Sequence, residues 1–159
     1  MDPSDAASKV YSEAVVVDGL NVSNWESLAV FDSLNAGGVT AINATIAVWE
    51  GYVEAMDNVA AWIRRLGERE ANLSQVTGVQ DILDAKRSGK TGVILGWQNA
   101  SPIENDLDRL DLFYGLGVRV IQLTYNESNL LGNGCWERND DGLSHFGADA
   151  VREMNHLAS

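Results

Sequence analysis

Four neutral polar side chains stand where two buried strands of this sequence are expected to end. Gln98 and Asn99 follow the apolar run TGVILGW, and Tyr125 and Asn126 come at the end of VRVIQLTY. Parallel strands bring their carboxyl ends, where ligands bind, to one edge of a sheet. Amide and hydroxyl groups at that edge favour recognition of a small ligand by hydrogen bonds. We therefore expect these four side chains to line a pocket.

A carboxylate stands at a similar place earlier in the chain. The stretch VVVDGLNVSNW (residues 15–25) begins as an apolar run and passes through Asp18 into small polar residues. Asp18 could act as a metal ligand or base, or it could accept hydrogen bonds from the backbone or from an asparagine. One carboxylate without histidines makes no zinc site, which favours the second interpretation.

Short apolar runs and longer amphipathic stretches alternate along the chain. This alternation predicts a parallel α/β sheet of about four strands with right-handed crossover helices. The strands are expected at residues 14–18, 39–47, 91–97 and 118–125, and the helices at 25–35, 54–70, 77–89 and 105–117 and after Ser144.

Composition limits the partners and the compartment. The 159 residues carry a net charge of -12, which argues against nucleic acid and against an anionic membrane surface. The first residues, MDPSDAASKV, contain neither the basic nor the apolar region of a secretory signal. No apolar run approaches the ~18 residues of a membrane helix. The lone cysteine, Cys135, suits a reducing compartment, so a cytoplasmic protein is expected.

Two longer stretches resemble a known family. GWQNASPIENDLDRLDLFYGLGVRVIQLTYNESNLLGNGC and the later DGLSHFGADAVREMNHL are similar to the membrane (renal-type) dipeptidase family, peptidase family M19. The similarity runs from about Val15 to the last residue. The resemblance implies a TIM-type (β/α)₈ amidohydrolase-like barrel about twice this length, which holds two zinc ions and hydrolyses dipeptides. Residues 1–159 are accordingly expected to form one truncated domain, the N-terminal half of such a barrel.

The resemblance also locates the family's metal ligands, and this sequence departs from them. A His-x-Asp pair ends the family's first strand, where Leu20 and Val22 stand here, and a bridging glutamate is replaced by Gln98. Aliphatic side chains offer no lone pair to zinc, so Leu20 and Val22 are expected to pack in the barrel mouth. Gln98 could orient a water or a ligand amide, or simply be hydrogen-bonded at a strand end. This chain alone is expected to bind no zinc.

Other candidate residues are weaker. Tyr125 replaces a family histidine that helps to hold the substrate, and its hydroxyl could donate to an oxyanion or only form a wall. His145 and His156 lie on the expected last helix, eleven positions apart, and cannot chelate one ion together. Four tryptophans near strand ends or loops could be pocket walls or core residues: Trp25, Trp49, Trp97 and Trp136.

Three functions follow from these residues. The first is a zinc dipeptidase-like hydrolase acting on dipeptides, an enzyme by family resemblance, of which this chain alone is inactive. The alternative is a non-catalytic homologue that binds a dipeptide-like small molecule. The third is an assembly in which two half-barrels form a homodimer through their exposed sheet edges. A truncated sequence is the simpler explanation of the missing half.

Overall fold

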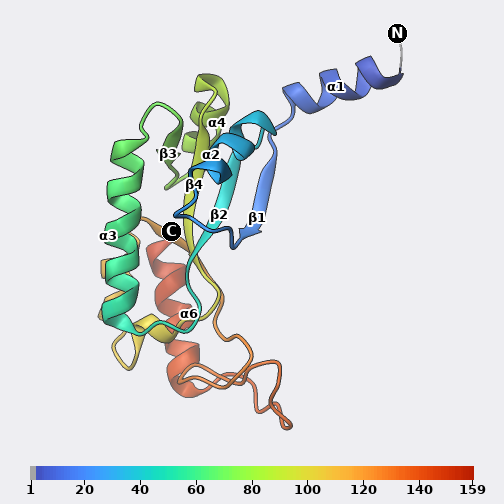
Figure 1. Cartoon of the computed structure of the whole chain (residues 1–159). Coiled ribbons are helices and arrows are strands. Elements are labelled where there is room, and N and C mark those ends of the chain that lie inside the picture. Colours follow the sequence, from blue (N-terminus) through green and yellow to red (C-terminus); the bar gives the residue numbers. More distant parts are fainter. Residues whose placement is uncertain (1–2) are drawn as a thin grey trace. The chain divides into compact units, whose positions relative to one another are not determined.

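The computed structural model describes residues 3–159, which alternate between helices and strands (Figure 1). The described chain divides into two compact units. The first contains the chain up to Ala44 together with Leu66–Ile94, and the second contains Thr45–Arg65 and Leu95–Ser159. Two strands and one helix begin in one unit and end in the other, so each unit is described by the part that belongs to it.

The first unit is built on parallel strands in the order β1-β2-β4-β3. Val17 of β1 lies opposite Ala41 of β2, and Leu73 of β3 lies opposite Thr91 of β4. The Gly92 N–H donates to the Thr40 carbonyl at 2.8 Å beside the β2–β4 pair. The elements in chain order are α1 (Pro3–Glu13), β1 (Val17–Asn21), α2 (Leu28–Ala36), the first part of β2 (Ala41–Ala47), β3 (Leu73–Gln75), α4 (Val79–Ser88) and the first part of β4 (Thr91–Trp97).

Helix α1 extends away from β1, as Figure 1 shows. Its tie to the rest of the first unit is the Tyr11 hydroxyl, which donates to the Gly37 carbonyl at 2.7 Å. The ring of Tyr11 is itself half exposed. A helix with so little packing draws little stability from tertiary contact.

The middle strands of the first unit form its core. Ala41, Ile42 and Val93 are fully buried, which is typical of parallel strands covered on both faces. Gly92 is required by this packing, because a Cβ there would lie 2.7 Å from Cγ2 of Val76. The chain that follows β3 therefore packs directly on the backbone of β4.

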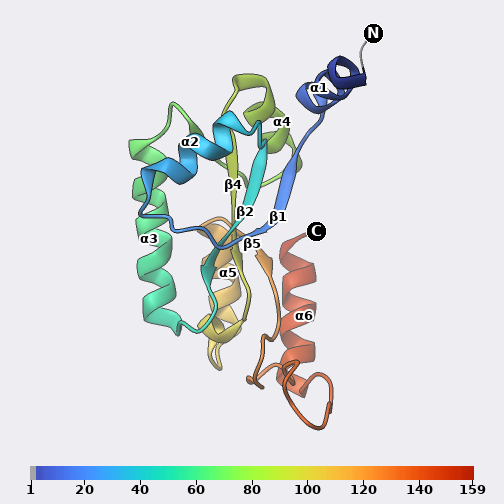
Figure 2. The same cartoon turned by 45° about the vertical axis from the view of Figure 1, so that its right-hand side comes forward.

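The second unit is built on the carboxyl ends of β2 and β4 and on β5. Leu95 of β4 lies opposite Val118 of β5, again in parallel. Helices α5 and α6 pack against each other, and Figure 2 shows both beside β5. The further elements are α3 (Tyr52–Glu68, as far as Arg65), the 3-10 turn η1 (Ser101–Ile103), α5 (Asp108–Gly115), β5 (Val118–Ile121) and α6 (His145–Leu157).

Aromatic rings form the core of the second unit. Phe113 of α5 is fully buried, and its ring lies edge to face against Trp97 with centroids 4.6 Å apart. Tyr52, the first residue of α3, meets the same ring at 5.9 Å. Aromatic pairs of this geometry add to the burial of apolar area. They anchor α3 and α5 to the end of β4.

The expected α/β class and the alternation of strands and helices are confirmed, with local corrections. The first strand begins three residues later than predicted, at Val17, and the short strand β3 and helix α1 were not predicted. Helix α3 buries Ala55, Val59 and Trp62, whereas the apolar Ile63, next to Trp62, is 47% exposed. Its apolar stripe is turned because the large indole takes the buried position.

Local hydrogen bonds and backbone conformation set the ends of two predicted helices. Ser144 precedes α6, and its hydroxyl accepts a hydrogen bond from the Gly147 N–H at 2.9 Å. Gly89 ends α4 in the left-handed conformation at φ 68°. The N-cap of α4 is Gly78, one residue after Thr77. The Gly78 N–H donates to the Asp81 carboxylate at 3.0 Å. Within residues 3–159, no helix is both long and apolar enough to cross a membrane.

Candidate functional site

Asp18, the second residue of β1 in the first unit, lies in a local hydrogen-bond network. Its carboxylate accepts from the Leu20 N–H at 3.2 Å and from the Asn21 side-chain amide at 2.8 Å. These are the backbone and asparagine contacts that one of the two interpretations of Asp18 predicted. Asn43 of β2 donates to the Gly19 carbonyl at 2.9 Å, while its own buried Oδ1 has no partner in the described chain. Asp18 therefore stabilises the part of β1 between Asp18 and Asn21, where the pairing with β2 shifts its register.

Leu20 and Val22 do not pack as expected. Their exposed fractions are 53% and 67%. β1 pairs with β2 alone among the described strands, so its far edge is open and its side chains have few neighbours. The expectation that these two residues are buried in a barrel mouth is corrected for the chain described.

Gln98 begins the site of the second unit, immediately after β4. It is 6% exposed, and its side-chain amide donates to Thr45 Oγ1 at 3.1 Å. Its backbone N–H donates to the Ala47 carbonyl at 2.9 Å. Two contacts to β2 thus fix both the backbone and the amide plane of Gln98. An amide fixed in this way is suited to recognising another amide.

Asn99, the next residue, joins the strand end to the loop after β5. It is 6% exposed, and its Oδ1 accepts from the Asn129 side-chain amide at 2.7 Å. The same amide donates to the Leu123 carbonyl at 2.6 Å. Asn129 Oδ1 in turn accepts from the Leu131 N–H at 2.7 Å. Through its Oδ1, Asn99 thus helps to hold the loop that carries Asn129.

Tyr125 and Asn126 start this loop, and their backbone carbonyls hold its later part. Tyr125 accepts from the Cys135 N–H at 2.9 Å, and Asn126 accepts from the Trp136 N–H at 2.8 Å. Gly134 is needed at this return, because a Cβ there would overlap the backbone of Asn126. The structure thus brings Gln98, Asn99, Tyr125 and Asn126 to the ends of β4 and β5 in one unit.

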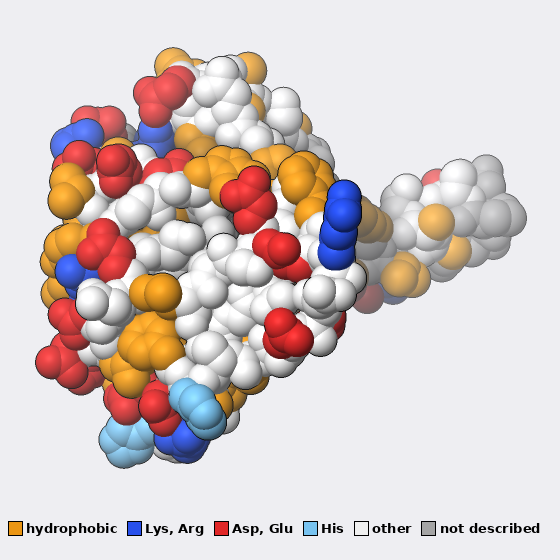
Figure 3. Space-filling model, turned by 90° about the horizontal axis from the view of Figure 1, so that it is seen from below, with side chains coloured by type: hydrophobic (Ala, Val, Ile, Leu, Met, Phe, Trp, Pro, Cys, Tyr) orange, Lys and Arg blue, Asp and Glu red, His pale blue; other side chains and the backbone are white. Residues whose placement is uncertain are grey.

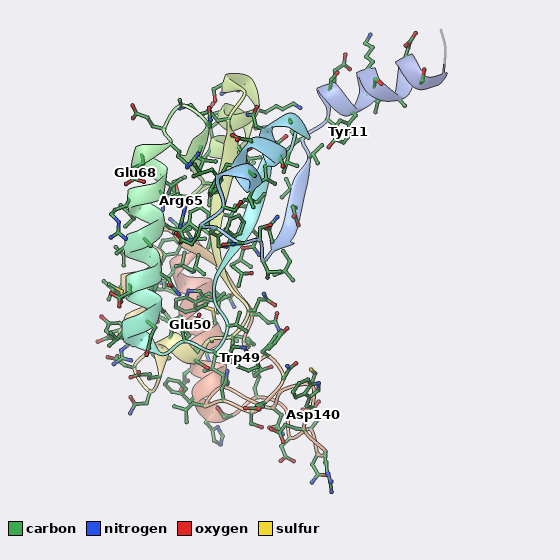
Figure 4. The ribbon with its side chains drawn as sticks, viewed as in Figure 1. Tyr11, Trp49, Glu50, Arg65, Glu68 and Asp140 are labelled. Atoms are coloured by element: carbon green, nitrogen blue, oxygen red, sulfur yellow. The ribbon has the colours of Figure 1, made fainter. Side chains whose placement is uncertain are left out.

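Two residues between β2 and α3 join this group, and Figure 4 shows both. Trp49 meets the Tyr125 ring edge to face, with centroids 5.2 Å apart and an angle of 72° between the rings. The Glu50 carboxylate accepts from the Val48 N–H at 2.7 Å and from the Trp49 N–H at 2.9 Å. Trp49 is one of the four tryptophans expected near strand ends or loops, whereas Glu50 was not predicted as a site residue. Its signal was an acidic residue placed just before a helix.

The other three candidate tryptophans differ in how far they are buried, and both histidines are exposed. Trp97 is buried in the core at 2% exposure, with its indole N–H lacking a partner in the described chain. Trp136 is 70% exposed in the loop, and Trp25 packs against Phe31 with ring centroids 6.1 Å apart. His145 and His156 are exposed on α6, as predicted.

The residues present do not fit a zinc centre. Among residues 3–159, no group of three or more His, Cys, Asp or Glu side chains is placed to hold a metal ion. Leu20 and Val22 offer hydrocarbon, and the neutral amide of Gln98 is already engaged with Thr45. A zinc site takes imidazole, thiolate or carboxylate donors. No catalytic step through zinc can be derived from this chain.

The second unit also carries an ion pair between Glu104, which follows η1, and Arg109 of α5. Arg109 Nη1 lies 2.6 Å from the Glu104 carboxylate, and its guanidinium stacks on the Tyr52 ring at 4.2 Å. The hydrogen bond from Arg109 lowers the pKa of Glu104 below its ordinary value, and the Tyr52 N–H adds to this. Elsewhere acidic side chains are scattered, as on the face seen in Figure 3. The acidity therefore makes no single cation-binding patch on this face.

Similar solved structures show the class of protein to which this fold belongs. A structure of an amidohydrolase from Pseudomonas aeruginosa superposes with a TM-score of 0.91 at 37% identity, covering 94% of this chain and 46% of that one. The probable dipeptidase PvdM of the same organism superposes with a TM-score of 0.81 at 17% identity. The chain thus has the α/β architecture of TIM-barrel-like dipeptidases and spans about half the length of these structures.

The family follows from the sequence comparison. The model of the membrane dipeptidase family, peptidase family M19, matches residues 5–158, and the chain belongs to this family. A curated relative, Dipeptidase tcpJ of Claviceps purpurea, is 33% identical over 79 residues, which are 48% of this chain and 19% of that protein. The family resemblance seen in the sequence is thereby confirmed.

Proposed function

We propose that this chain forms the recognition side of a site for a dipeptide-like small molecule in a hydrolase of the membrane dipeptidase family. The observation that carries the proposal is the fixed amide of Gln98, held by Thr45 and β2 at the end of the parallel strands. Family membership supports the substrate class, and the strand-end position agrees with where α/β enzymes bind ligands. The whole protein's activity on dipeptides is part of this proposal.

The chemistry assigned to this chain is binding and orientation. Gln98 presents a neutral amide to the peptide group of the ligand, and Asn99 and Asn126 hold the loop that carries Tyr125. The Tyr125 hydroxyl is a neutral donor for the oxygen that becomes negative when a carbonyl is attacked. The family's zinc would polarise the scissile carbonyl and activate water where it is bound. This chain's residues do not supply its ligands.

A second function, binding without hydrolysis, is favoured by one observation. All three positions that the family resemblance assigns to metal ligands in this chain carry Leu20, Val22 and Gln98. A homologue with these residues can bind a dipeptide without hydrolysing it. Ligand binding is common to both functions, whereas turnover belongs only to the first.

The decisive experiment measures binding and turnover together. The purified 159-residue chain is titrated with glycyl-phenylalanine by calorimetry, with added zinc and with EDTA, and hydrolysis is followed by release of free amino acid. We expect binding that is unchanged by EDTA and no turnover by this chain. Turnover that EDTA abolishes would contradict the conclusion that Leu20, Val22 and Gln98 do not supply metal ligands. Absence of binding to any dipeptide would overturn the proposed function itself.

The Gln98→Leu variant is the matched test of the recognising group, since leucine is close to glutamine in size and has no amide. It is expected to bind the dipeptide about tenfold more weakly, the effect of one neutral hydrogen bond. Gln75→Leu, on β3 of the first unit, is the control for replacing a partly buried glutamine. Equal affinity of Gln98→Leu and the wild-type chain would exclude Gln98 from the site.

A further inference from the structure

The strongest feature that the proposed function leaves unused is an exposed tryptophan held in a fixed orientation. Trp49 is 59% exposed although it lies two residues after β2, a largely buried strand. Exposed single hydrophobic residues are common, but most are free to change rotamer. Trp49 is constrained from two sides, at its backbone and at its ring.

The backbone constraint comes from Glu50. One carboxylate oxygen of Glu50 accepts hydrogen bonds from the Val48 N–H at 2.7 Å and from the Trp49 N–H at 2.9 Å. Charged acceptors make the stronger hydrogen bonds of proteins. Because Glu50 is itself followed by Gly51 and helix α3, the turn that carries Trp49 is fixed at both of its ends.

The ring constraint comes from Tyr125. The two rings are perpendicular to within about twenty degrees, since the angle between them is 72° and the centroids are 5.2 Å apart. This edge-to-face arrangement uses the attraction between the positive edge of one ring and the negative face of the other. It leaves more than half of the Trp49 surface open to solvent.

The position of the pair relates it to Gln98. Trp49 follows β2 and Tyr125 follows β5, and β4 lies between these strands in the second unit. The Gln98 N–H is bonded to Ala47 on one side, and the Gln122 N–H is bonded to the Trp97 carbonyl on the other, at 3.0 Å. The two rings of the aromatic pair therefore come from segments that follow the strands on either side of β4, the strand that immediately precedes Gln98.

We infer that Trp49 and Tyr125 form a specificity surface that selects dipeptide-like ligands with an aromatic side chain. This inference rests on the proposed function and names the substrate class of the same site. Aromatic rings stack on an exposed indole face, and a ring already oriented loses little freedom on binding. No cationic side chain contacts the pair in the contacts described, so an acidic ligand side chain gains nothing there.

The test compares three probes on the 159-residue chain by calorimetric titration: glycyl-phenylalanine, glycyl-glycine and glycyl-glutamate. We expect glycyl-phenylalanine to bind about tenfold more tightly than the other two. Trp49→Ala should remove that preference, so that the three probes bind with similar affinity, and Trp49→Phe should retain part of it. Trp136→Ala removes another exposed indole of the same unit and should keep the full preference.

The outcomes separate this inference from the proposed function. Equal binding of all three probes by the wild-type chain would overturn the aromatic selectivity and leave dipeptide recognition intact. Absence of binding to every probe would overturn both. Circular dichroism and the melting temperature of each variant show whether it is folded. If Trp49→Ala is unfolded, Trp49→Phe decides: a preference for glycyl-phenylalanine smaller than that of the wild-type chain supports the inference, and a preference equal to that of the wild-type chain contradicts it.

Discussion

The rings of Trp49 and Tyr125 are in contact although they follow β2 and β5, two strands that both pair with β4 and not with each other. Such a contact is made possible by parallel strands, which deliver successive loops to the same edge of a sheet. It links the segment before α3 to the long loop after β5. The groups proposed to recognise the ligand are therefore positioned by tertiary contacts between segments far apart in sequence.

The buried amide of Gln98 gives the first prediction. Replacing it by glutamate, the residue the family resemblance implies there, places a carboxylate at a position that is 6% exposed. Burial raises the pKa of a carboxyl group, so the folded chain binds more protons than the unfolded one. The Gln98→Glu variant should therefore lose stability as pH rises from about 5 to 7, by roughly 1–3 kcal/mol.

Urea unfolding at pH 5, 6 and 7 measures this effect, with the wild-type chain as reference. Glu68→Gln on α3 is a control for the change of one charge on an exposed surface. If added zinc restored the stability of Gln98→Glu, the variant would have gained a set of metal ligands. That result would contradict the conclusion that the other residues present do not fit a zinc centre.

Gly147 gives the second prediction, because α6 approaches the loop closely there. A Cβ on Gly147 would overlap the backbone carbonyl of Leu131, while the Gly147 N–H also bonds Ser144 Oγ. Gly147→Ala should therefore lower the free energy of unfolding by about 2–4 kcal/mol, in the range of overpacked sites. Gly115→Ala at the end of α5 has open space and should be neutral or gain up to ~1 kcal/mol.

Both glycine variants are compared by urea unfolding at one pH. The contrast between them tests the close contact itself, since each adds the same methyl group to a helical glycine of the second unit. A Gly147→Ala variant as stable as Gly115→Ala would show that α6 does not approach Leu131 in this way.

Ser144 and Gly89 show which parts of the fold the sequence predicts well. Both act through local chemistry: a hydroxyl that accepts the Gly147 N–H, and a residue without a Cβ at φ 68°. The strand TGVILGW has the predicted bounds because its residues are apolar throughout and flanked by polar ones. Signals that depend on a few neighbouring residues can be recognised without knowing the fold.

Trp62 and Leu20 show what could not be predicted. The periodicity of α3 is compatible with more than one inner face, and only the packing around Trp62 selects the face that includes Ala55 and Val59. Leu20 was expected to be buried because its type is apolar, but β1 is an edge strand in the first unit. Likewise, the contact of Trp49 with Tyr125 depends on strand order, which periodicity does not contain.

The open edge of β1 gives the third prediction. Val17 is 46% exposed on a strand that pairs only with β2 among those described, and unpaired strand edges favour association with another chain. We expect the 159-residue chain to form a homodimer, the partner proposed from the sequence. A lysine at Val17 should shift it toward monomer, because charges on an edge oppose pairing.

Size-exclusion chromatography with light scattering measures the mass over a range of concentrations. Val53→Lys changes an exposed valine of helix α3 in the same way and should leave the mass unchanged. A wild-type chain that stays monomeric at every concentration would contradict this prediction.

The ion pair of Glu104 and Arg109 gives the last prediction, a dependence of stability on acid. The pKa of Glu104 is lowered by its hydrogen bonds to Arg109 and to the Tyr52 N–H. A carboxyl group with a lowered folded pKa stabilises the chain above the unfolded value and loses that contribution as pH falls through the folded value. Part of the acid sensitivity below about pH 4.5 should therefore come from Glu104. Because the Glu104 side chain is half exposed, the effect is small and is weakened by salt.

Glu104→Gln keeps the size of the side chain and removes its charge. Its urea midpoint should be lower than that of the wild-type chain at pH 7, and the two should converge toward pH 3, where the wild-type carboxyl group is protonated as well. The backbone adds a further comparison, since Glu104 has φ 50°, the left-handed region that favours glycine. Glu104→Gly should be at least as stable as Glu104→Gln, because it loses the same charge and relieves the strain. A difference between Glu104→Gln and wild type that is the same at pH 3 and pH 7 would show that the loss comes from packing and not from the charge.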